Sequence, residues 1–343
     1  MDTRQQKNLY ALPSRGEATP PETDNKPYFQ WLLGPRRYPA FLSRVETIAR
    51  QQGPVLITGE SGSGKSTIAE LLHRKSDRAP GPLSRWGCGE FQPEFADAAL
   101  FGHTAQAFTG AKSELRGLLA SAHGGTVILD DIDYLPLPVQ GKLLRFLDSG
   151  SFRQLGRVDR EEASDVRIIA TTNKDLAALV REGRFLPDLL FRIRRWWLHL
   201  PPLRDSGEGV GHLAQHLLAN IDRRAHDIGE AGWHFDEDAL TVFSLMHLPG
   251  NFREIEDLVE VVAAFAEGDR LPITAEQLVD AITNNVYGGR EVIGITRDMN
   301  RDDAIERFLK LTGRRAHLTA KIVGCAPNTV YKVGRERGLL PGG

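Results

Sequence analysis

The first half of the chain alternates between two kinds of hydrophobic pattern. In PAFLSRVETIARQQG the apolar residues Phe41, Val45 and Ile48 recur at helical spacing. PVLITGESGSGKSTIAELLHRKS then passes from a short apolar run through a glycine-rich turn into a second helical pattern. Further β-branched runs at 126–129 and 166–170 predict two more buried strands, with helical stretches such as VQGKLLRFLDSG between them. Strands alternating with helices predict an α/β fold whose parallel sheet is covered on both faces.

After the motif LPPLRD the strand signals stop. HLAQHLLANIDRRAHDIG, DEDALTVFSLMHL, NFREIEDLVEVVAAFAEG and TAEQLVDAITNNV have the spacing of successive amphipathic helices. We therefore predict the following organisation: a flexible arm at 1–26, an α/β unit at 27–205, a helical lid at 206–285, a linker at 286–300 and a helical C-terminal domain at 301–343.

A phosphate-binding motif follows the first predicted strand. The segment matches G-x-x-x-x-G-K-[ST] at every fixed position, directly between the strand VLIT and the helix STIAELLH. Its glycines allow backbone N–H groups to surround phosphates, and its lysine and serine are suited to the β/γ oxygens and to Mg²⁺. A glycine-rich turn that binds nothing is the alternative. The predicted nucleotide-binding residues are Gly59, Glu60, Ser61, Gly62, Ser63, Gly64, Lys65, Ser66 and Thr67.

Two acids and an amide follow the later strands. Asp130 and Asp131 close the run that begins at Thr126, where P-loop enzymes place a metal-organising carboxylate and then a water-activating one. We predict that Asp130, with Ser66, binds Mg²⁺, and that Asp131 is a general base. Asn173 ends the next strand and is a candidate sensor of the γ-phosphate. Solvated turn acids and a capping asparagine remain the alternatives.

Composition and charge change this picture in one respect. The 343 residues have a formal net charge of -2, which by itself argues against a nucleic-acid partner. That total combines +7 over residues 307–343 with -9 over the rest, so the C-terminal segment is suited to DNA. Cys88 and Cys325 form no disulfide or zinc pattern, and we find no signal peptide and no apolar run long enough to span a membrane. We expect a cytoplasmic protein without a membrane partner.

Several motifs resemble one bacterial family. LFGHTAQAFTGAKSELRGLLASAHGGTVILDDID is similar to the stretch with a G-A-F-T-G-A loop and Walker B strand in bacterial enhancer-binding proteins, the ATPase activators of sigma-54 RNA polymerase. LPLPVQGKLLRFLDSGSFRQLG, RIIATTNKDL, LPPLRD and PGNFREIEDL also resemble the family and stand in its order, from about Trp31 to Ile282. The resemblance implies an AAA+ P-loop NTPase with a parallel sheet, an all-α lid and a C-terminal helix-turn-helix. It also implies a homo-oligomeric ring, most often a hexamer, with ATP bound between subunits.

The resemblance implies roles for single residues as well. Lys65 and Ser66 would contact the nucleotide and its metal, Asp130 and Asp131 would form the Walker B pair, and Asn173 would be sensor I.

The resemblance also implies roles for residues that lie outside these strand ends. Arg253 of GNFREI would be sensor II, and Arg192 of PDLLFRIR would be an arginine finger supplied to the neighbouring subunit. Phe108, Thr109 and Gly110 would form the loop that grips sigma-54. The residues alone leave open that Arg192 is a surface ion-pair residue and that Phe108 is a core residue.

Four positions depart from the family pattern. Gln106 replaces the first loop glycine, so a positive φ there would be strained. Asp131 stands where the family has Glu, which shortens the reach of the base by roughly 1.5 Å. Gly87 replaces the Asn that pairs with that Glu. Leu186 replaces the first of two finger arginines, although Arg184 lies close enough in sequence to substitute. These departures allow a weakened or differently gated ATPase.

The C-terminal segment resembles the Fis-type helix-turn-helix that ends most members of the family. RAHLTAKIVG, the turn CAPN and TVYKVGRERG would be its two helices and turn, although Gly334 lowers the helix propensity of the second by about 1 kcal/mol. The second helix would lie in the major groove and the preceding arginines on phosphates. A basic tail without sequence specificity is the alternative. The predicted DNA-binding residues are Arg314, Arg315, Asn328, Thr329, Tyr331, Lys332 and Arg335.

Taken together, these features predict an activator that binds upstream DNA and uses ATP hydrolysis to remodel sigma-54 RNA polymerase into an open promoter complex. Two other functions stay open: a DNA-binding regulator whose AAA+ domain binds nucleotide but hydrolyses it weakly, and a remodeller of a different protein. Only about 30 residues precede the ATPase, so we expect a stand-alone type without a receiver or sensor domain, controlled by a regulatory partner in trans, by expression or by ATP and DNA.

Overall fold

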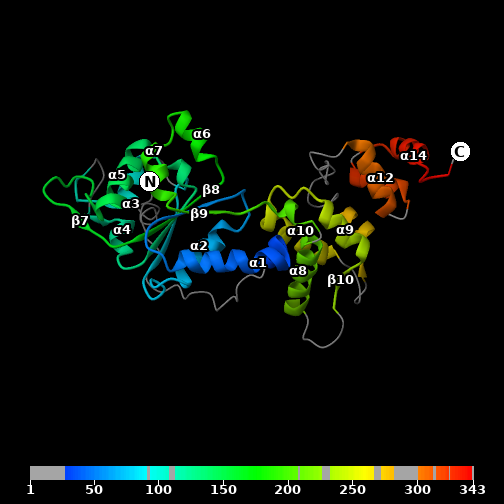
Figure 1. The fold of residues 1–343 in the computed structure, drawn as a ribbon, viewed down its shortest axis with the longest axis horizontal. Helices are drawn as coiled ribbons and strands as arrows, with labels where there is room; N and C mark the ends of the chain where they lie inside the picture. Colours follow the sequence, from blue (N-terminus) through cyan, green and yellow to red (C-terminus); the bar gives the residue numbers. More distant parts are fainter. Residues whose placement is uncertain are drawn as a thin grey trace, which may run out of the picture.

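The structure is a computed structural model that describes residues 28–90, 93–107, 113–207, 209–225, 232–265, 272–281, 300–311, 314–323 and 325–341. Three groups of elements follow one another along the longest axis in Figure 1: a sheet with its helices, a group containing α8, α9 and α10, and a group containing α12 and α14. The predicted arm at 1–26 lies outside the described residues, as do positions 286–299 of the predicted linker.

Five parallel strands form the main sheet in the order β2-β5-β8-β1-β9. They are β1 (Val55–Thr58), β2 (Leu83–Gly87), β5 (Thr126–Asp130), β8 (Arg167–Thr172) and β9 (Trp196–His199). The predicted parallel α/β sheet is confirmed, and its three central strands are the predicted ones. The two edge strands were not predicted, because the half-exposed sequences LSRWG and WWLH lack a continuous apolar run.

Helices cover both faces of this sheet. On one face lie α1 (Tyr28–Ala49), which is kinked at Gly34, and α2 (Lys65–Arg74). On the other lie α3 (Pro93–Phe101), α4 (Leu118–Ser121), α5 (Leu137–Ser149), α6 (Leu176–Arg181) and α7 (Pro187–Ile193). Strand side chains alternate between the two cores: Val55 and Ile57 pack with the first group of helices, and Leu56 packs with the second.

A buried arginine joins α1 to the sheet. Arg167, the first residue of β8, is 3% exposed and donates hydrogen bonds to the carbonyls of Ala49 (2.7 Å) and Ile48 (2.7 Å). These carbonyls lie in the last turn of α1, where no later residue of the helix can donate to them, and the Ile48 carbonyl also accepts from the N–H of Gln51 at 3.1 Å. Burial lowers the pKa of Arg167 to about 10, so the side chain remains charged at neutral pH.

Two short hairpins extend from the sheet domain: β3 (Gly102–His103) with β4 (Leu115–Arg116), and β6 (Ser151–Phe152) with β7 (Glu162–Ala163). Gln106 lies after β3 with a φ of 68°, a conformation that costs a residue with a Cβ about 1 kcal/mol or more. The strain expected at this substitution is therefore present. Phe108, Thr109 and Gly110, the predicted sigma-54 contact loop, lie outside the described residues.

The next group is mainly helical. It contains α8 (Gly209–Ala225), α9 (Glu237–Leu245), α10 (Asn251–Phe265) and α11 (Ala275–Ala281), preceded by the 3₁₀ turn η3 (Leu203–Ser206). A parallel pair, β10 (His234–Phe235) and β11 (Pro272–Ile273), corrects the expectation that strands stop after LPPLRD. Two residues in each strand are too few to produce a period-two pattern. α1 packs against α8, so this group and the sheet share one hydrophobic core.

The last group consists of α12 (Arg301–Leu311), α13 (Ala316–Val323) and α14 (Pro327–Glu336), which pack against one another. Packing explains Gly334, which lies in the last turn of α14. A Cβ at this position would lie 2.6 Å from the side chain of Leu340 and 2.8 Å from that of Leu309. Glycine therefore allows α14 to approach α12, which offsets its low helix propensity. Among the described helices we find none with the length and hydrophobicity of a membrane span.

Candidate functional site

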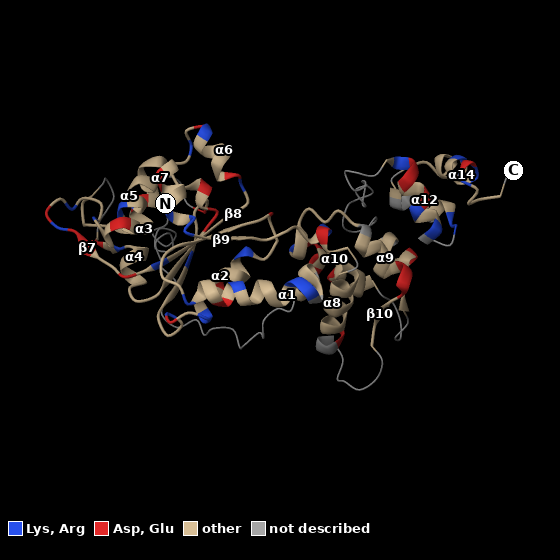
Figure 2. Cartoon of the chain, viewed as in Figure 1, with Lys and Arg blue, Asp and Glu red and all other residues tan. Residues whose placement is uncertain are grey.

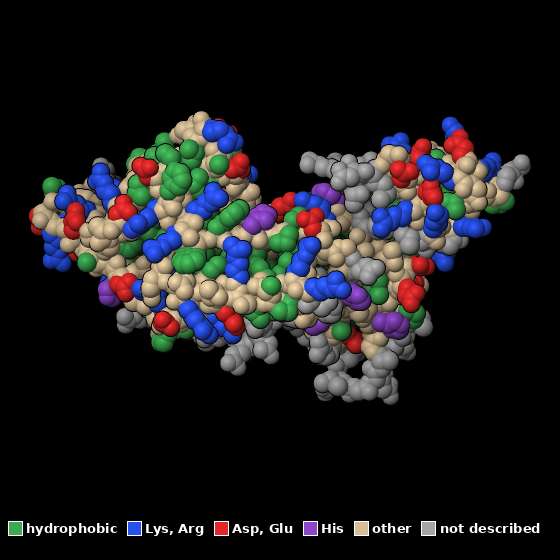
Figure 3. Space-filling view, in the orientation of Figure 1, with side chains coloured by type: hydrophobic (Ala, Val, Ile, Leu, Met, Phe, Trp, Pro, Cys, Tyr) green, Lys and Arg blue, Asp and Glu red, His purple; other side chains and the backbone are tan. Residues whose placement is uncertain are grey.

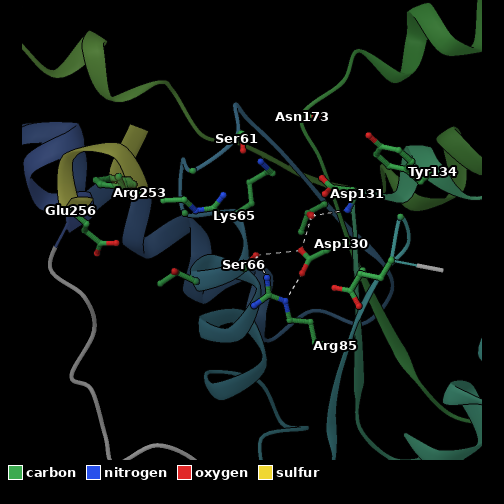
Figure 4. A pocket seen from close by; sticks show the side chains of 18 of the residues that line it. Ser61, Lys65, Ser66, Arg85, Asp130, Asp131, Tyr134, Asn173, Arg253 and Glu256 are labelled. Carbon is green, nitrogen blue, oxygen red and sulfur yellow. Dashed lines mark hydrogen bonds and ion pairs between the residues drawn. The ribbon is translucent and has the colours of Figure 1, made fainter. Parts of the chain in front are cut away.

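A cavity of about 640 Å³ opens where the central strands end, and its size is typical of ligand pockets. The loop after β1, the ends of β5 and β8, and the start of α10 form its walls (Figure 4). Most of the predicted nucleotide-site residues therefore meet here, although they are far apart in sequence. The predicted residues that line the cavity are Ser61, Gly62, Gly64, Lys65, Ser66, Thr67, Asp130, Asp131, Asn173 and Arg253.

Lys65 is the first residue of α2 and points into this cavity. Its Nζ donates hydrogen bonds back to the carbonyls of Gly59 (3.0 Å) and Glu60 (2.8 Å). Burial lowers the pKa of the Lys65 ammonium, while Asp131 and Asp130 act in the opposite direction. A cation at the N-terminus of a helix, next to the first free N–H groups of that helix, is suited to a polyphosphate.

Two glycines allow other elements to contact the outside of the phosphate loop. Gly62 has a φ of 72°, and a Cβ there would lie 2.0 Å from the carbonyl oxygen of Gly250. Gly64 has a φ of 88°, and its Cβ would lie 2.7 Å from the ring of Phe29. Both positions thus need glycine for conformation and for space. The loop is held between α1 and the residues before α10, with its inner side toward the cavity.

Oxygen atoms suited to a hard divalent cation meet at the end of β5. The Ser66 hydroxyl donates to Oδ1 of Asp130 at 3.3 Å, and Thr171 donates to the same oxygen at 2.8 Å. A hydroxyl and a carboxylate next to a phosphate site are the donor set that Mg²⁺ uses in P-loop proteins. Ser66 and Asp130 therefore fit the predicted metal site, and Thr171 orients the carboxylate.

Arg85 completes this cluster and was not predicted. Its Nε donates to Oδ2 of Asp130, and its Nη2 donates to the Ser66 hydroxyl at 2.8 Å (Figure 4). The side chain comes from edge strand β2, whose residues pair in register with those of β5. It is the residue two positions before Gly87.

Asp131 follows β5 with a φ of 53°. Its backbone N–H donates to the Thr171 hydroxyl at 3.3 Å. Burial and the neighbouring Asp133 raise the pKa of the Asp131 carboxyl, whereas Lys65 lowers it. Asp133 itself accepts a hydrogen bond from the Thr172 hydroxyl at 2.5 Å, which ties its side chain to the end of β8.

Glu60 belongs to the phosphate motif, but its side chain binds another arginine. Its two oxygens accept hydrogen bonds from Arg204 at 2.6 and 2.7 Å, and one accepts from Asn251 at 3.3 Å. These contacts lower the pKa of Glu60 to about 2. Glu60 does not line the cavity, and neither do Gly59 and Ser63.

Asn251 connects the phosphate loop to α10 and was also not predicted. It is fully buried and has a φ of 53°. Its amide oxygen accepts from the N–H of Leu203 (2.7 Å), and its amide nitrogen donates to the carbonyl of Ser61 (2.9 Å). The next residue, Phe252, donates its N–H to Gly62 at 3.0 Å. Asn251 stands in the motif PGNFREI, which could have pointed to it, but from that motif we predicted a role only for Arg253.

Arg253 and Asn173 contribute exposed side chains to the cavity from α10 and from the end of β8. Arg192 does not line it. Arg192 lies on α7, where its Nη2 donates to the carbonyl of Leu147 at 2.7 Å and its Nε lies 3.1 Å from Asp148. In this chain it is an ion-pair residue on the surface, beside Phe191, which is 80% exposed.

The remaining departures from the family pattern also have defined surroundings. A Cβ on Gly87 would lie 2.4 Å from the carboxylate of Glu90, which lines the cavity. Leu186 precedes α7, and its N–H donates to Gln140 at 2.8 Å. Arg184 pairs with Glu182 at 3.1 Å rather than with a residue of the cavity.

Five of the predicted DNA-binding residues lie on α14. Asn328, Tyr331, Lys332 and Arg335 are exposed on α14 and Thr329 is half-buried, while Val330 and Val333 face the core. Lys and Arg residues are interspersed with acids on this group of helices (Figures 2 and 3).

Arg314 and Arg315 precede α13, and both are exposed. Arg315 lies 3.3 Å from Glu276 of α11. One predicted phosphate-contacting residue is thus paired with the preceding helical group.

The fold and this cavity define an AAA+ P-loop NTPase domain. Comparison with known proteins then identifies the family: residues 36–199 match the sigma-54 interaction domain. The chain is 40% identical over 315 residues to the alginate biosynthesis transcriptional regulatory protein AlgB of Pseudomonas aeruginosa, covering 88% of this chain and 66% of AlgB. It is 30% identical over 323 residues to the regulatory protein LuxO of Vibrio cholerae, covering 91% of this chain and 70% of LuxO. The chain belongs to the family of sigma-54-dependent transcription activators, the bacterial enhancer-binding proteins.

A third relative is the response regulator protein PilR of P. aeruginosa, 38% identical over 292 residues, with 84% of this chain and 64% of PilR covered. The chain spans between about half and two thirds of the length of the first curated relatives it matches. Among solved structures, NtrX from Brucella abortus in complex with ADP matches with a TM-score of 0.66 and 26% identity, over 89% of this chain and 69% of NtrX. The same protein in complex with ATP matches with a TM-score of 0.64 and 25% identity, over 88% of this chain and 67% of NtrX.

Proposed function

We propose that this chain is an ATP-hydrolysing activator that binds upstream DNA and remodels sigma-54 RNA polymerase into an open promoter complex. The observation that carries the proposal is the convergence of Lys65, Asp130, Asn173 and Arg253 on one cavity, although they come from four separate segments. Membership of the family and the ADP- and ATP-bound NtrX structures support the nucleotide.

The chemistry we infer is attack of water on the γ-phosphate of ATP. Lys65 and the N–H groups of residues 61–67 would hold the phosphates, and Asn173 and Arg253 would contact the γ-phosphate. Asp131 would accept the proton of the attacking water, and its raised pKa favours that role. Ser66 and Asp130 would hold Mg²⁺, which when bound neutralises developing negative charge on the phosphates.

Hydrolysis in this proposal depends on a ring, most simply a hexamer. Arg192 does not line the cavity of its own chain, so it would act on the nucleotide of the neighbouring subunit. A cation placed on the transferring phosphoryl group accelerates related reactions by about 10³ to 10⁵-fold. Assembly would therefore switch hydrolysis on.

Each predicted domain would have its own role. Residues 27–205 and 206–285 would form the ATPase and its lid, and the loop with Phe108, Thr109 and Gly110 would contact sigma-54. The helix-turn-helix within 301–343 would bind double-stranded DNA, with the exposed side chains of α14 in the major groove and Arg314 and Arg315 on phosphates. We expect the protein to act in the cytoplasm.

Two measurements on the full-length chain test the proposal: phosphate release from ATP, and capture of sigma-54 with a transition-state analogue of ATP. We expect phosphate release that depends on Lys65, and capture of sigma-54 that Thr109→Ala abolishes. Capture that is equal in the wild type and in Thr109→Ala would contradict it.

A second candidate is a DNA-binding regulator that binds nucleotide but hydrolyses it weakly and does not remodel sigma-54. Gly87 next to Asp130, and the left-handed Gln106, favour it. This candidate expects nucleotide binding with almost no phosphate release, with or without DNA.

A further inference from the structure

Arg85 places a guanidinium in the cluster to which Ser66 and Asp130 contribute their oxygens. Nε donates to one oxygen of Asp130, and Nη2 donates to the Ser66 hydroxyl at 2.8 Å. The Asp130 side chain is 14% exposed, so the bond from Nε is a charge-assisted hydrogen bond to a largely buried carboxylate. The guanidinium thus links the start of α2 to the end of β5, the two elements that the proposed metal would also link.

A second acid lies within reach of the same side chain. Nη1 of Arg85 is 3.8 Å from Glu70, which lies one helical turn after Ser66 on α2. The Arg85 side chain is 52% exposed. It can therefore move toward Glu70 by side-chain rotation, without disturbing the packed core.

We propose that the guanidinium of Arg85 occupies the metal site and holds Ser66 and Asp130 together. It must move toward Glu70 before Mg²⁺ binds. The proposal rests on the proposed function, since it requires a nucleotide and Mg²⁺ at this cavity. A guanidinium and a divalent cation about 4 Å apart repel each other, and both need the same oxygens. Nucleotide binding therefore depends less on Mg²⁺ than it would at a site that had the oxygen donors but no Arg85.

The test is the dissociation constant of ADP, measured by calorimetry on the full chain in EDTA and in excess Mg²⁺. The constant in EDTA divided by the constant in excess Mg²⁺ reports how much Mg²⁺ strengthens binding. Charge-assisted hydrogen bonds shift such equilibria by about tenfold or more, so we expect this ratio to rise by about tenfold in Arg85→Gln. Arg85→Ala should give the same change without a side-chain amide.

Two further variants test the contribution of Glu70 and of an arginine outside the cavity. Glu70→Gln removes the second partner of Arg85, so the ratio should fall below that of the wild type. Arg50→Ala removes an exposed arginine at the end of α1, outside the cavity, and should leave the ratio unchanged. Circular dichroism of all variants verifies that they are folded.

The outcomes separate this proposal from the proposed function. Equal ratios in the wild type, Arg85→Gln and Arg85→Ala would overturn the role of Arg85 while leaving the nucleotide site in place. Absence of ADP binding by the wild type in both buffers would overturn the nucleotide site itself, and the role of Arg85 with it.

Discussion

The carboxylate of Glu60 accepts two hydrogen bonds from the guanidinium of Arg204, at 2.6 and 2.7 Å. Glu60 lies in the phosphate loop, and Arg204 lies in the turn η3 that follows the last strand of the sheet. Asn251 binds the same carboxylate from the start of α10. The phosphate loop is therefore fixed from outside by the segment that leads into the helical group, so its conformation depends on that group.

This ion pair predicts a specific pH dependence of stability. The pKa of Glu60 is lowered from its ordinary 4.5 to about 2, so its contribution is present above pH 4.5 and is lost as the pH falls toward 2. The pair is partly exposed, and we therefore expect Glu60→Gln to cost only about 1 kcal/mol at pH 7. The difference in unfolding free energy from the wild type should shrink between pH 4.5 and 2. Glu46→Gln, which alters an exposed pair with Lys75, is the control; a constant difference for Glu60→Gln would refute the prediction.

Asn251→Ala should destabilise the protein by about 2 to 3 kcal/mol. The change leaves the N–H of Leu203 and the carbonyl of Ser61 without their buried partner, and it places alanine at a φ of 53°. ADP affinity should fall too, because the phosphate loop loses a support. Asn300→Ala removes the cap of α12 and is the contrast: it should lower stability but not ADP affinity. Equal ADP binding by Asn251→Ala and the wild type would count against the coupling.

Thr171→Val should reduce hydrolysis more than nucleotide binding. Valine has a similar shape, but it removes the hydrogen bonds to the Asp130 carboxylate (2.8 Å) and to the Asp131 N–H (3.3 Å). Misplacement of catalytic groups by about 1 Å costs on the order of 100-fold in rate, so we expect a loss of about 10 to 100-fold in phosphate release. Thr241→Val, on the exposed side of α9, should have no such effect. Unchanged phosphate release in Thr171→Val would show that these contacts do not position the acids.

The position of Arg192 outside its own cavity predicts complementation between subunits. Lys65→Ala and Arg192→Ala should each lose about 10³-fold or more of phosphate release. In a mixture, Arg192→Ala subunits retain an intact nucleotide site and Lys65→Ala subunits retain Arg192, so some interfaces should recover activity. A mixture of Arg192→Ala with a Lys65→Ala/Arg192→Ala double variant has no complete interface and should stay inactive. Recovery in neither mixture would argue against a finger in trans.

Sequence reasoning identified most of the cavity because its residues lie in local motifs. The glycine-rich loop and the acids at the end of β5 are each recognisable within a few residues, and parallel strands bring their ends to one edge. The supports could not be found in this way. Glu60 and Arg204 are separated by 144 positions, and Asn251 and Ser61 by 190, so only the folded chain brings them together.

Arg85 was missed for a related reason. It lies on the half-exposed edge strand β2, whose sequence LSRWG gives no strand signal, and an isolated arginine there is indistinguishable from a surface residue. The register of β2 with β5 is what directs it to Asp130. The strain at Gln106, in contrast, was predictable, because the family has glycine where this chain has a residue with a Cβ.

The most direct test of the proposed function is promoter opening in vitro with sigma-54 RNA polymerase, followed by the reactivity of unpaired bases in a promoter with upstream binding sites. We predict strand opening with the wild type and ATP, and none with Lys65→Ala or Thr109→Ala. Absence of ATP-dependent opening by a wild-type protein that assembles into a ring and contacts sigma-54 would contradict it.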